Sequence, residues 1–184
     1  MRNLIFAINT TLDGCCDHTK GIADEELLEH YTELLGDVGL LVYGRKTYQL
    51  MVPYWPGVAK NQSSTRAEKE FARAFVAANK IVFSRSLGSA EDQNTRIVRG
   101  NLRDEILKLK QEEGKNIVVG GVDIPAQLIE LGLVDEYRFV VQPILAGEGR
   151  RLLEAVSLPE RLQIKLVESK IFKSGCVALR YLKQ

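Results

Sequence analysis

Short apolar runs alternate with amphipathic helical segments from the start of the chain to about Asp135, and this alternation constrains the possible folds most strongly. Buried strands are predicted at residues 4–9, 38–43, 80–83, 96–99 and 116–119. Helices are predicted at residues 25–36 after an N-cap at Asp24, at 45–51, at 66–78 and after an N-cap at Asn101, and the proline-rich residues 52–57 are expected to form a loop. Beyond Asp135 only strands are predicted, at residues 137–142, 163–169 and 177–182. We therefore expect one α/β domain, residues 1–184, with a mixed, mostly parallel sheet that has helices on its faces and finishes in antiparallel strands.

Composition excludes several classes of function. The 25 Lys and Arg residues almost balance the 24 Asp and Glu residues, so the chain lacks the basic footprint of a nucleic-acid-binding protein. No apolar run approaches the roughly 20 residues of a membrane span, and Asn9 and Thr10 interrupt the first run too early for a signal peptide. The three cysteines and two histidines have no metal-ligand spacing. We expect a cytoplasmic protein with reduced thiols and without a nucleic-acid or membrane partner. No metal site is assigned: the spacing excludes zinc, and magnesium stays open.

Three turns that directly follow predicted strands carry the residue types that hold phosphate groups: Gly44-Arg45-Lys46-Thr47, Ser84-Arg85-Ser86 and Gly120-Gly121-Val122-Asp123-Ile124-Pro125. Arg99 closes a further strand. Ligands of open α/β sheets bind beyond the carboxyl ends of strands, so these cations would collect at one edge. Each turn taken alone is explained as well by ordinary turn formation and helix capping. Together they favour a cofactor with several phosphates, and NADPH, with its additional 2′-phosphate, fits.

Two common nucleotide motifs do not match. Gly39, Gly44 and Lys46 have the spacing of a P-loop, but residues 40–43 are strand-like where that motif needs an open loop. Gly147 and Gly149 lack a third glycine and come too late in the chain for a dinucleotide-binding turn.

The order of these motifs resembles the dihydrofolate reductase-like fold, a three-layer α/β/α arrangement. The resemblance rests on Thr11-Leu12-Asp13-Gly14, Tyr43-Gly44-Arg45-Lys46-Thr47-Tyr48, Val119-Gly120-Gly121, Val134-Asp135-Glu136 and Pro143 through Gly147-Glu148-Gly149, and it covers nearly the whole chain. It is closest to the branch typified by the C-terminal reductase domain of the bifunctional riboflavin-biosynthesis deaminase-reductase. The other domain of that bifunctional enzyme is a zinc deaminase with a characteristic cysteine motif, and this sequence has no match to that motif.

The resemblance implies a role for each matching residue. Ala7 would lie against the nicotinamide, and Gly44, Arg45, Lys46 and Thr47 would hold phosphates and the adenosine side. Ser84, Arg85 and Arg99 would surround the 2′-phosphate, and Gly120, Gly121, Asp123 and Ile124 would hold the pyrophosphate. Tyr48, Tyr54 and Trp55 would border the substrate, although Trp55 fits simple packing equally well. The segment around Asp13 and Gly14 would be a mobile loop that closes over the nicotinamide.

The chain departs from dihydrofolate reductases at the residue that assists protonation of the pterin. Those enzymes resemble one another in having an acidic residue on the first helix, and the corresponding position here lies near the apolar Leu28. Asp24 and Asp13 are the remaining candidate catalytic carboxylates, and Asp13 is interpreted equally well as a turn residue before Gly14.

Three hypotheses of function follow. The first is an NADPH-dependent reductase of a small heterocyclic or ribosylated pyrimidine or pteridine substrate, and the alternative is a non-catalytic nucleotide-binding module of the same fold. A purely structural protein, the third, predicts no nucleotide binding. Turnover of the cofactor discriminates between the first two. The late strands at residues 137–141 and 177–179 could also present a sheet edge to a second copy, because the resembling reductase domains form homodimers, or they could belong to the domain's own core.

Overall fold

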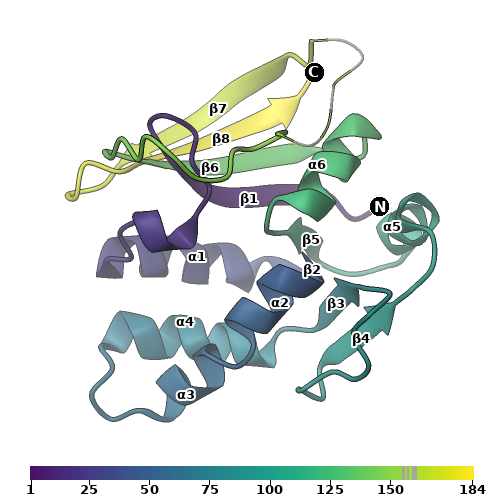
Figure 1. The fold of residues 1–184 in the computed structure, drawn as a ribbon, viewed down its shortest axis with the longest axis horizontal. Helices are drawn as coiled ribbons and strands as arrows, with labels where there is room; N and C mark the ends of the chain where they lie inside the picture. Colours follow the sequence, from purple (N-terminus) through teal and green to yellow (C-terminus); the bar gives the residue numbers. More distant parts are fainter. Residues whose placement is uncertain (155, 157, 159–160) are drawn as a thin grey trace. The chain divides into compact units, whose positions relative to one another are not determined.

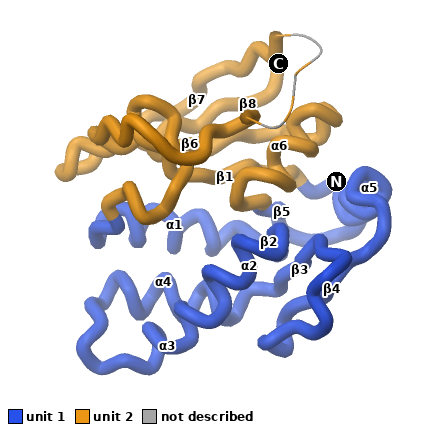
Figure 2. Tube along the Cα trace, in the orientation of Figure 1, with its two compact units in different colours: residues 1–2, 23–118 blue, residues 3–22, 119–184 orange. Residues whose placement is uncertain are grey.

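The structure, a computed structural model, describes residues 1–154, 156, 158 and 161–184 (Figure 1). The described residues form two compact units, shown in different colours in Figure 2. Unit 1 comprises Met1–Arg2 and Ala23–Val118, and unit 2 comprises Asn3–Ile22 and Val119–Gln184. Each unit has its own run of strands and its own buried apolar side chains.

The strands of unit 1 follow the order β4-β3-β2-β5, in which β2, β3 and β4 are parallel, and β5 reaches unit 2 at its last residue, Val119. Their bounds are Val38–Gly44 for β2, Lys80–Phe83 for β3, Thr95–Val98 for β4 and Asn116–Val119 for β5. The helices of this unit are α1 (Glu25–Gly36), α2 (Arg45–Met51), α3 (Trp55–Lys60), α4 (Arg66–Ala77) and α5 (Leu102–Gln111). Most apolar residues of β2, β3 and β5 are buried, which explains their apolar runs, whereas Phe83 and Ile97 are half-buried.

Side-chain caps define where the longer helices of unit 1 begin. The carboxylate of Asp24 accepts a hydrogen bond from the backbone N–H of Leu27 at the start of α1, as predicted. Asn101 caps α5 in the same way. At α4, Thr65 and Glu68 form a reciprocal capping box, each side chain accepting from the other's backbone N–H.

The prediction of a loop at residues 52–57 is confirmed for residues 52–54, which form a turn, and is wrong for residues 55–57, because α3 begins at Trp55. Pro56 lies in the first turn of this helix. A backbone N–H in the first turn has no partner inside a helix, so proline costs nothing there and its fixed φ suits the start.

Unit 2 contains the strands β1-β6-β8-β7 in that order. The bounds are Leu4–Thr11 for β1, Glu136–Gln142 for β6, Ile164–Ile171 for β7 and Val177–Lys183 for β8. β1 and β6 are parallel, whereas β6 pairs with β8 and β8 with β7 in antiparallel fashion. Helix α6 (Asp123–Glu130) precedes β6, and a short 3₁₀ helix, η1 (His18–Lys20), lies in the connection after β1.

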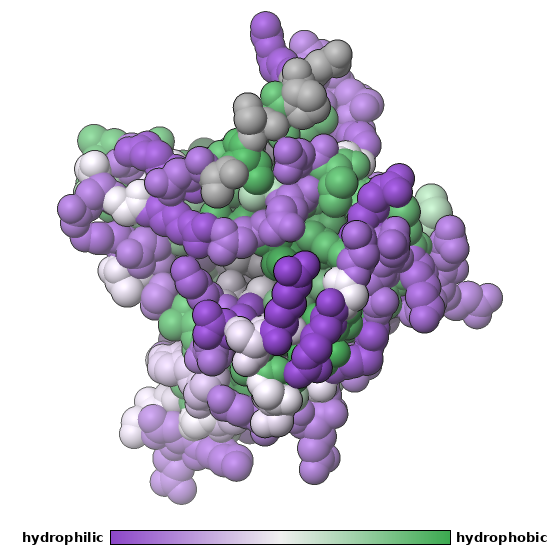
Figure 3. All heavy atoms as spheres, turned by 45° about the vertical axis from the view of Figure 1, so that its right-hand side comes forward, coloured by the Kyte–Doolittle hydropathy of each residue, from purple (hydrophilic) through white to green (hydrophobic). Residues whose placement is uncertain are grey.

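The predicted α/β class, with mostly parallel strands and antiparallel C-terminal strands, is confirmed. Of the two alternatives for residues 137–141 and 177–179, the structure agrees with the domain's own core, because β6 and β8 each have a strand on both sides and β7 is at the end of this run. Hydrophilic side chains predominate on the face of the molecule in Figure 3, with hydrophobic residues visible between them. No helix among the described residues is long and apolar enough to span a membrane.

Candidate functional site

Three of the predicted phosphate-binding positions lie at the same edge of the sheet in unit 1. β2, β3 and β4 are adjacent and parallel, and their register pairs Gly44 with Phe83 and Phe83 with Val98. The strands therefore end level with one another, and Ser84 and Arg99 follow β3 and β4 directly. This is the carboxyl edge, where open α/β sheets bind their ligands.

The cations at this edge face solvent. Arg45 and Lys46, in the first turn of α2, are exposed, as are Arg85 and Arg99 after the neighbouring strands. Thr47 is half-buried on the same helix. Guanidinium groups form paired hydrogen bonds with phosphate oxygens, so the residue types present here fit an anion that carries several phosphates.

Hydrogen bonds within the turn after β3 keep it in a defined shape. The Ser84 hydroxyl accepts from the backbone N–H groups of Ser86 and Leu87, at 3.3 and 3.0 Å. The Arg99 guanidinium donates to the Leu87 carbonyl at 2.7 Å. Ser84 and Arg99 thus shape the turn that presents Arg85.

Tyr48 does not border an open substrate site, contrary to the prediction. Its side chain is completely buried in unit 1. The phenolic group donates to the Asp92 carboxylate at 3.1 Å and accepts from the backbone N–H of Glu91 at 2.7 Å. Burial raises the pKa of Tyr48, which keeps the phenol protonated and able to donate. Tyr48 lies three residues after Arg45, the first residue of α2, and its ring belongs to the core of unit 1.

Tyr54 and Trp55, the other predicted substrate residues, have different environments. The Trp55 ring packs edge-on against Phe71 of α4, with ring centroids 4.5 Å apart, so it contributes to the contact between α3 and α4. Tyr54 is 58% exposed and lines a hollow of about 580 Å³. Of the three aromatic residues, Tyr54 has a ring face that a flat ligand can reach.

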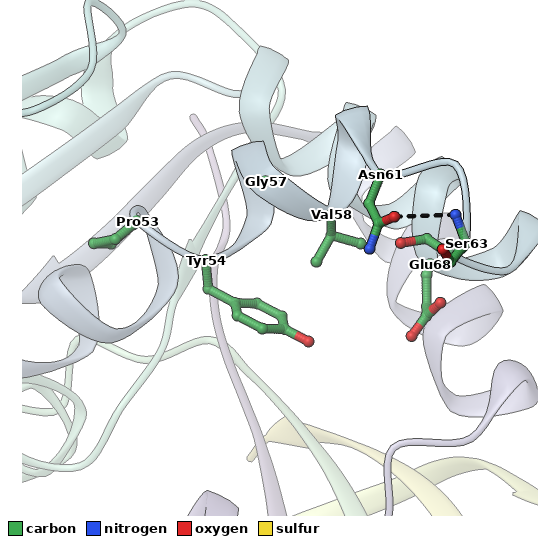
Figure 4. Close-up of a pocket in the computed structure, with 8 residues that line it drawn as sticks. Pro53, Tyr54, Gly57, Val58, Asn61, Ser63 and Glu68 are labelled. Atoms are coloured by element: carbon green, nitrogen blue, oxygen red, sulfur yellow. Dashed lines mark hydrogen bonds between the residues drawn. The ribbon is translucent and has the colours of Figure 1, made fainter.

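Several residues of this hollow were missed by the sequence analysis. Figure 4 shows Tyr54, Val58 and Glu68 around the same space, with Asn61 and Ser63 at one end. The Asn61 side-chain oxygen accepts from the Ser63 backbone N–H at 3.0 Å, which orders this end. The polar run before α4 was the available signal, but a polar run marks a loop or a cap far more often than a ligand site.

The glycine turn in unit 2 precedes α6 as predicted. Gly120 is buried, and Gly121 has a φ of +88°, a backbone conformation that glycine adopts readily. Ile124 is half-buried in the first turn of α6. Ala7 is buried in β1.

Asp123 is not the N-cap of α6. Val122 is the N-cap residue and makes no side-chain hydrogen bond, and Asp123 is the first residue of the helix. The carboxylate of Asp123 instead accepts two hydrogen bonds from the guanidinium group of Arg150. Arg150 therefore lies at the N-terminus of α6 and was missed by the sequence analysis, because 27 residues separate it from Asp123.

Asp13 joins two connections of unit 2. Its carboxylate accepts from the Thr11 hydroxyl at 2.5 Å and from the backbone N–H groups of Ala146 and Gly147 at 3.1 and 2.8 Å. These three hydrogen bonds, that of Thr11 foremost, hold the pKa of Asp13 well below its usual range. An ionised carboxylate with these partners anchors a loop and is poorly suited to donate a proton.

Asp24, the second candidate catalytic carboxylate, is the N-cap of α1, and its Oδ1 accepts from the Leu27 backbone N–H at 2.8 Å. Leu28, near the position where dihydrofolate reductases have their acidic residue, is buried in the core of unit 1. Both candidate carboxylates thus have structural partners in the chain itself.

Comparison with known proteins gives consistent matches. The family model described as the RibD C-terminal domain matches residues 2–178. The uncharacterized protein YyaP of Bacillus subtilis is 32% identical over 184 residues, which cover 98% of this chain and 94% of that protein. A second uncharacterized protein of that bacterium, YwjB, is 24% identical over 174 residues, 89% of this chain and 90% of that protein.

Solved structures show the same fold at low sequence identity. A pyrimidine reductase-like protein from Corynebacterium diphtheriae superposes with a TM-score of 0.67 at 15% identity, covering 100% of this chain and 92% of that one. A diaminohydroxyphosphoribosylaminopyrimidine deaminase/5-amino-6-(5-phosphoribosylamino)uracil reductase from Thermotoga maritima gives a TM-score of 0.69 at 14% identity, covering 100% of this chain and 57% of that one. The expected fold is confirmed.

Proposed function

Because the chain belongs to the RibD C-terminal domain family, we propose that it is an NADPH-dependent reductase of a small heterocyclic or ribosylated pyrimidine or pteridine substrate. The observation that carries this proposal is the set of cations and hydroxyls beyond three adjacent parallel strands of unit 1. A reductase of this fold needs such a set to retain a phosphorylated cofactor while the substrate exchanges.

The residues at this edge fit the adenosine end of the cofactor. Arg45, Lys46 and Thr47 would bind phosphate oxygens from α2, and Gly44 has no side chain to obstruct the approach of a ligand. Ser84, Arg85 and Arg99 would take the 2′-phosphate, since they follow the two neighbouring strands. The bound nicotinamide supplies the hydride, and the protein's part is to orient the cofactor and exclude water.

The substrate class is supported by the names of the structural relatives. One is pyrimidine reductase-like, and another is a reductase of a phosphoribosylamino-uracil. An exposed aromatic ring at Tyr54 can stack on such a flat heterocycle. The buried Leu28 argues against folate chemistry of the dihydrofolate reductase type, which uses a carboxylate at the corresponding position.

One observation favours the alternative of a non-catalytic nucleotide-binding module. Asp13 and Asp24 are both held by hydrogen bonds within the chain, so neither is placed as a proton donor. A reductase would then obtain its proton from an ordered water or from another group. Oxidation of NADPH in the presence of a substrate distinguishes the enzyme from the module.

The proposal is tested by titrating the protein with NADPH and with NADH while nicotinamide fluorescence is followed. We expect the wild type to bind NADPH more tightly than NADH and the Arg45→Ala/Arg85→Ala variant to lose this preference, because both substitutions remove phosphate partners. Arg73→Ala/Lys108→Ala is the matched control, since it removes two exposed cations from α4 and α5 without touching the carboxyl edge.

A wild type that binds neither nucleotide would overturn the cofactor assignment. Binding without NADPH oxidation, in a screen that includes dihydrofolate and the phosphoribosylamino-uracil, would support the non-catalytic module.

A further inference from the structure

Two connections of unit 2, the one after β1 and the one after β6, are held together by hydrogen bonds. In the connection after β6, the Arg150 carbonyl accepts from the backbone N–H of Cys16 at 2.7 Å. The guanidinium group of the next residue, Arg151, donates to the Asp13 carbonyl. Because both bonds lead to the connection after β1, the backbone at Arg150 is held in place by a neighbouring segment.

The side chain of Arg150 extends from this backbone to the start of α6, the helix that follows the glycine turn. Its two terminal nitrogens donate to the two carboxylate oxygens of Asp123, Nη1 to Oδ2 at 3.2 Å and Nη2 to Oδ1. Paired hydrogen bonds of this kind fix the plane of a guanidinium group as well as its position. The side chains of Arg150 and Asp123 are 38% and 50% exposed, so a ligand in solution can reach the pair.

The carboxylate of Asp123 would by itself oppose an anion at this place. The first turn of a helix favours negative charge, and Asp123, the first residue of α6, already supplies one there. A phosphate group beside an unpaired carboxylate is repelled by it. Arg150 cancels this charge, and the pair uses two of the five N–H groups of the guanidinium. The guanidinium can therefore donate to a phosphate oxygen without releasing Asp123.

We propose that Arg150 is a cofactor-binding residue that donates to the pyrophosphate of the nucleotide at the start of α6. The inference rests on the proposed function, because it requires a dinucleotide whose pyrophosphate lies against the turn at Gly120 and Gly121. It gives this turn the cation that its own sequence lacks. The pyrophosphate is common to NADPH and NADH, so Arg150 contributes equally to the binding of both, whereas Arg45 and Arg85 are assigned to the preference for NADPH.

The first test is the affinity of Arg150→Ala for NADPH and for NADH, followed by nicotinamide fluorescence. We expect both Kd values to rise about tenfold, the effect of losing a hydrogen bond to a charged group, and their ratio to stay that of the wild type. Arg150→Gln keeps an amide donor for Asp123 but loses the charge, and it should show the same rise if the alanine variant does not fold. Lys20→Ala is the matched control, because it removes a cation that pairs with Glu148 of the same connection at 3.2 Å. It should change neither Kd by more than about twofold.

The variant Asp123→Asn separates a ligand contact from an ion pair that only supports the fold. It breaks the same ion pair as Arg150→Ala but keeps the guanidinium. We expect it to lower the Kd for both nucleotides about twofold, because a negative charge beside the pyrophosphate is removed. The double variant Arg150→Ala/Asp123→Asn should still bind both nucleotides several-fold more weakly than the wild type, because it lacks the donor.

The outcomes distinguish this inference from the proposed function. If the wild type binds neither nucleotide, the proposed function is overturned and the inference with it. If the wild type binds NADPH and Arg150→Ala binds it equally well, the inference alone is overturned. The same holds if Asp123→Asn weakens binding as much as Arg150→Ala, because the ion pair then acts through the fold. A double variant with wild-type affinity would also overturn it, because Arg150 would then serve only to neutralise Asp123.

Discussion

At the scale of single residues, the two glycines of the connection after β6 differ in what surrounds them. Both have positive φ, +74° at Gly147 and +106° at Gly149. A Cβ on Gly149 would lie 2.6 Å from the Cys15 sulfur, whereas a Cβ on Gly147 would meet nothing within 4 Å. Gly149 is constrained by packing and by its backbone conformation together, and Gly147 by its backbone conformation alone.

We therefore expect Gly147→Ala to lower the free energy of unfolding by about 1 kcal/mol, the cost of a left-handed backbone for an L-residue. Gly149→Ala should add a further loss of about 1–3 kcal/mol, because the buried Cys15 must move. Urea denaturation of both variants measures the difference. Equal losses would mean that the connection relaxes without cost around Cys15.

At the scale of elements, the Asp13 carboxylate ties the connection after β1 to the connection after β6. The pKa of Asp13 is lowered in the folded protein from an ordinary value of 3.8. The unfolded chain therefore binds this proton more readily than the folded chain. The stabilisation is complete above about pH 5 and is lost as the pH falls through the unfolded-state pKa towards the folded-state pKa.

Asp13→Asn should lower the melting temperature at pH 7, since the amide is a weaker acceptor for the Gly147 N–H group. We expect the difference from the wild type to stay constant down to about pH 5 and to narrow below about pH 4. Glu33→Gln is the matched control, because it also replaces a carboxylate by an amide, at an exposed position of α1. A difference that keeps its full size at acid pH would show that ionisation of Asp13 plays no part in stability.

At the scale of the whole molecule, β7 is an edge strand with exposed apolar side chains. Leu166 is 49% exposed and Ile171 is 77% exposed. An edge of this kind pairs readily with another strand, and a second copy of the chain offers an identical one. We therefore propose β7 as the strand through which two copies would pair, since β6 and β8, which the sequence left open between a sheet edge and the core, lie inside the sheet.

Sedimentation at micromolar concentration should accordingly give twice the chain mass of 20.6 kDa. The double variant Leu166→Lys/Ile171→Lys should shift the protein to the monomer. Leu145 is 77% exposed but lies outside β7, so Leu145→Lys should leave the dimer intact. A monomeric wild type would contradict the proposal. A dimer that persists in the double variant would place the interface elsewhere.

Much of the fold was predictable because local chemistry decided it. The apolar runs predicted β3 (Lys80–Phe83) and β5 (Asn116–Val119) to the residue, and the caps at Asp24 and Asn101 predicted where α1 and α5 begin. A helix cap and a buried strand depend on residues within a few positions of one another, so a sequence pattern suffices. Helix α3 was missed because two prolines in six residues ordinarily indicate a loop.

The arrangement of the site depended on contacts that only the tertiary structure makes. By itself the sequence determined which residue types follow each strand, and so the cations and hydroxyls that suit a phosphorylated cofactor. It did not determine that Tyr48 is bound by Glu91 and Asp92, because 43 and 44 residues separate these partners. The partners of Asp123 and Asp13, Arg150 and the backbone of Gly147, are similarly distant along the chain. A tyrosine or an aspartate has the same intrinsic chemistry at every position, and only the neighbours that the fold brings to it decide whether it binds a ligand or holds the structure together.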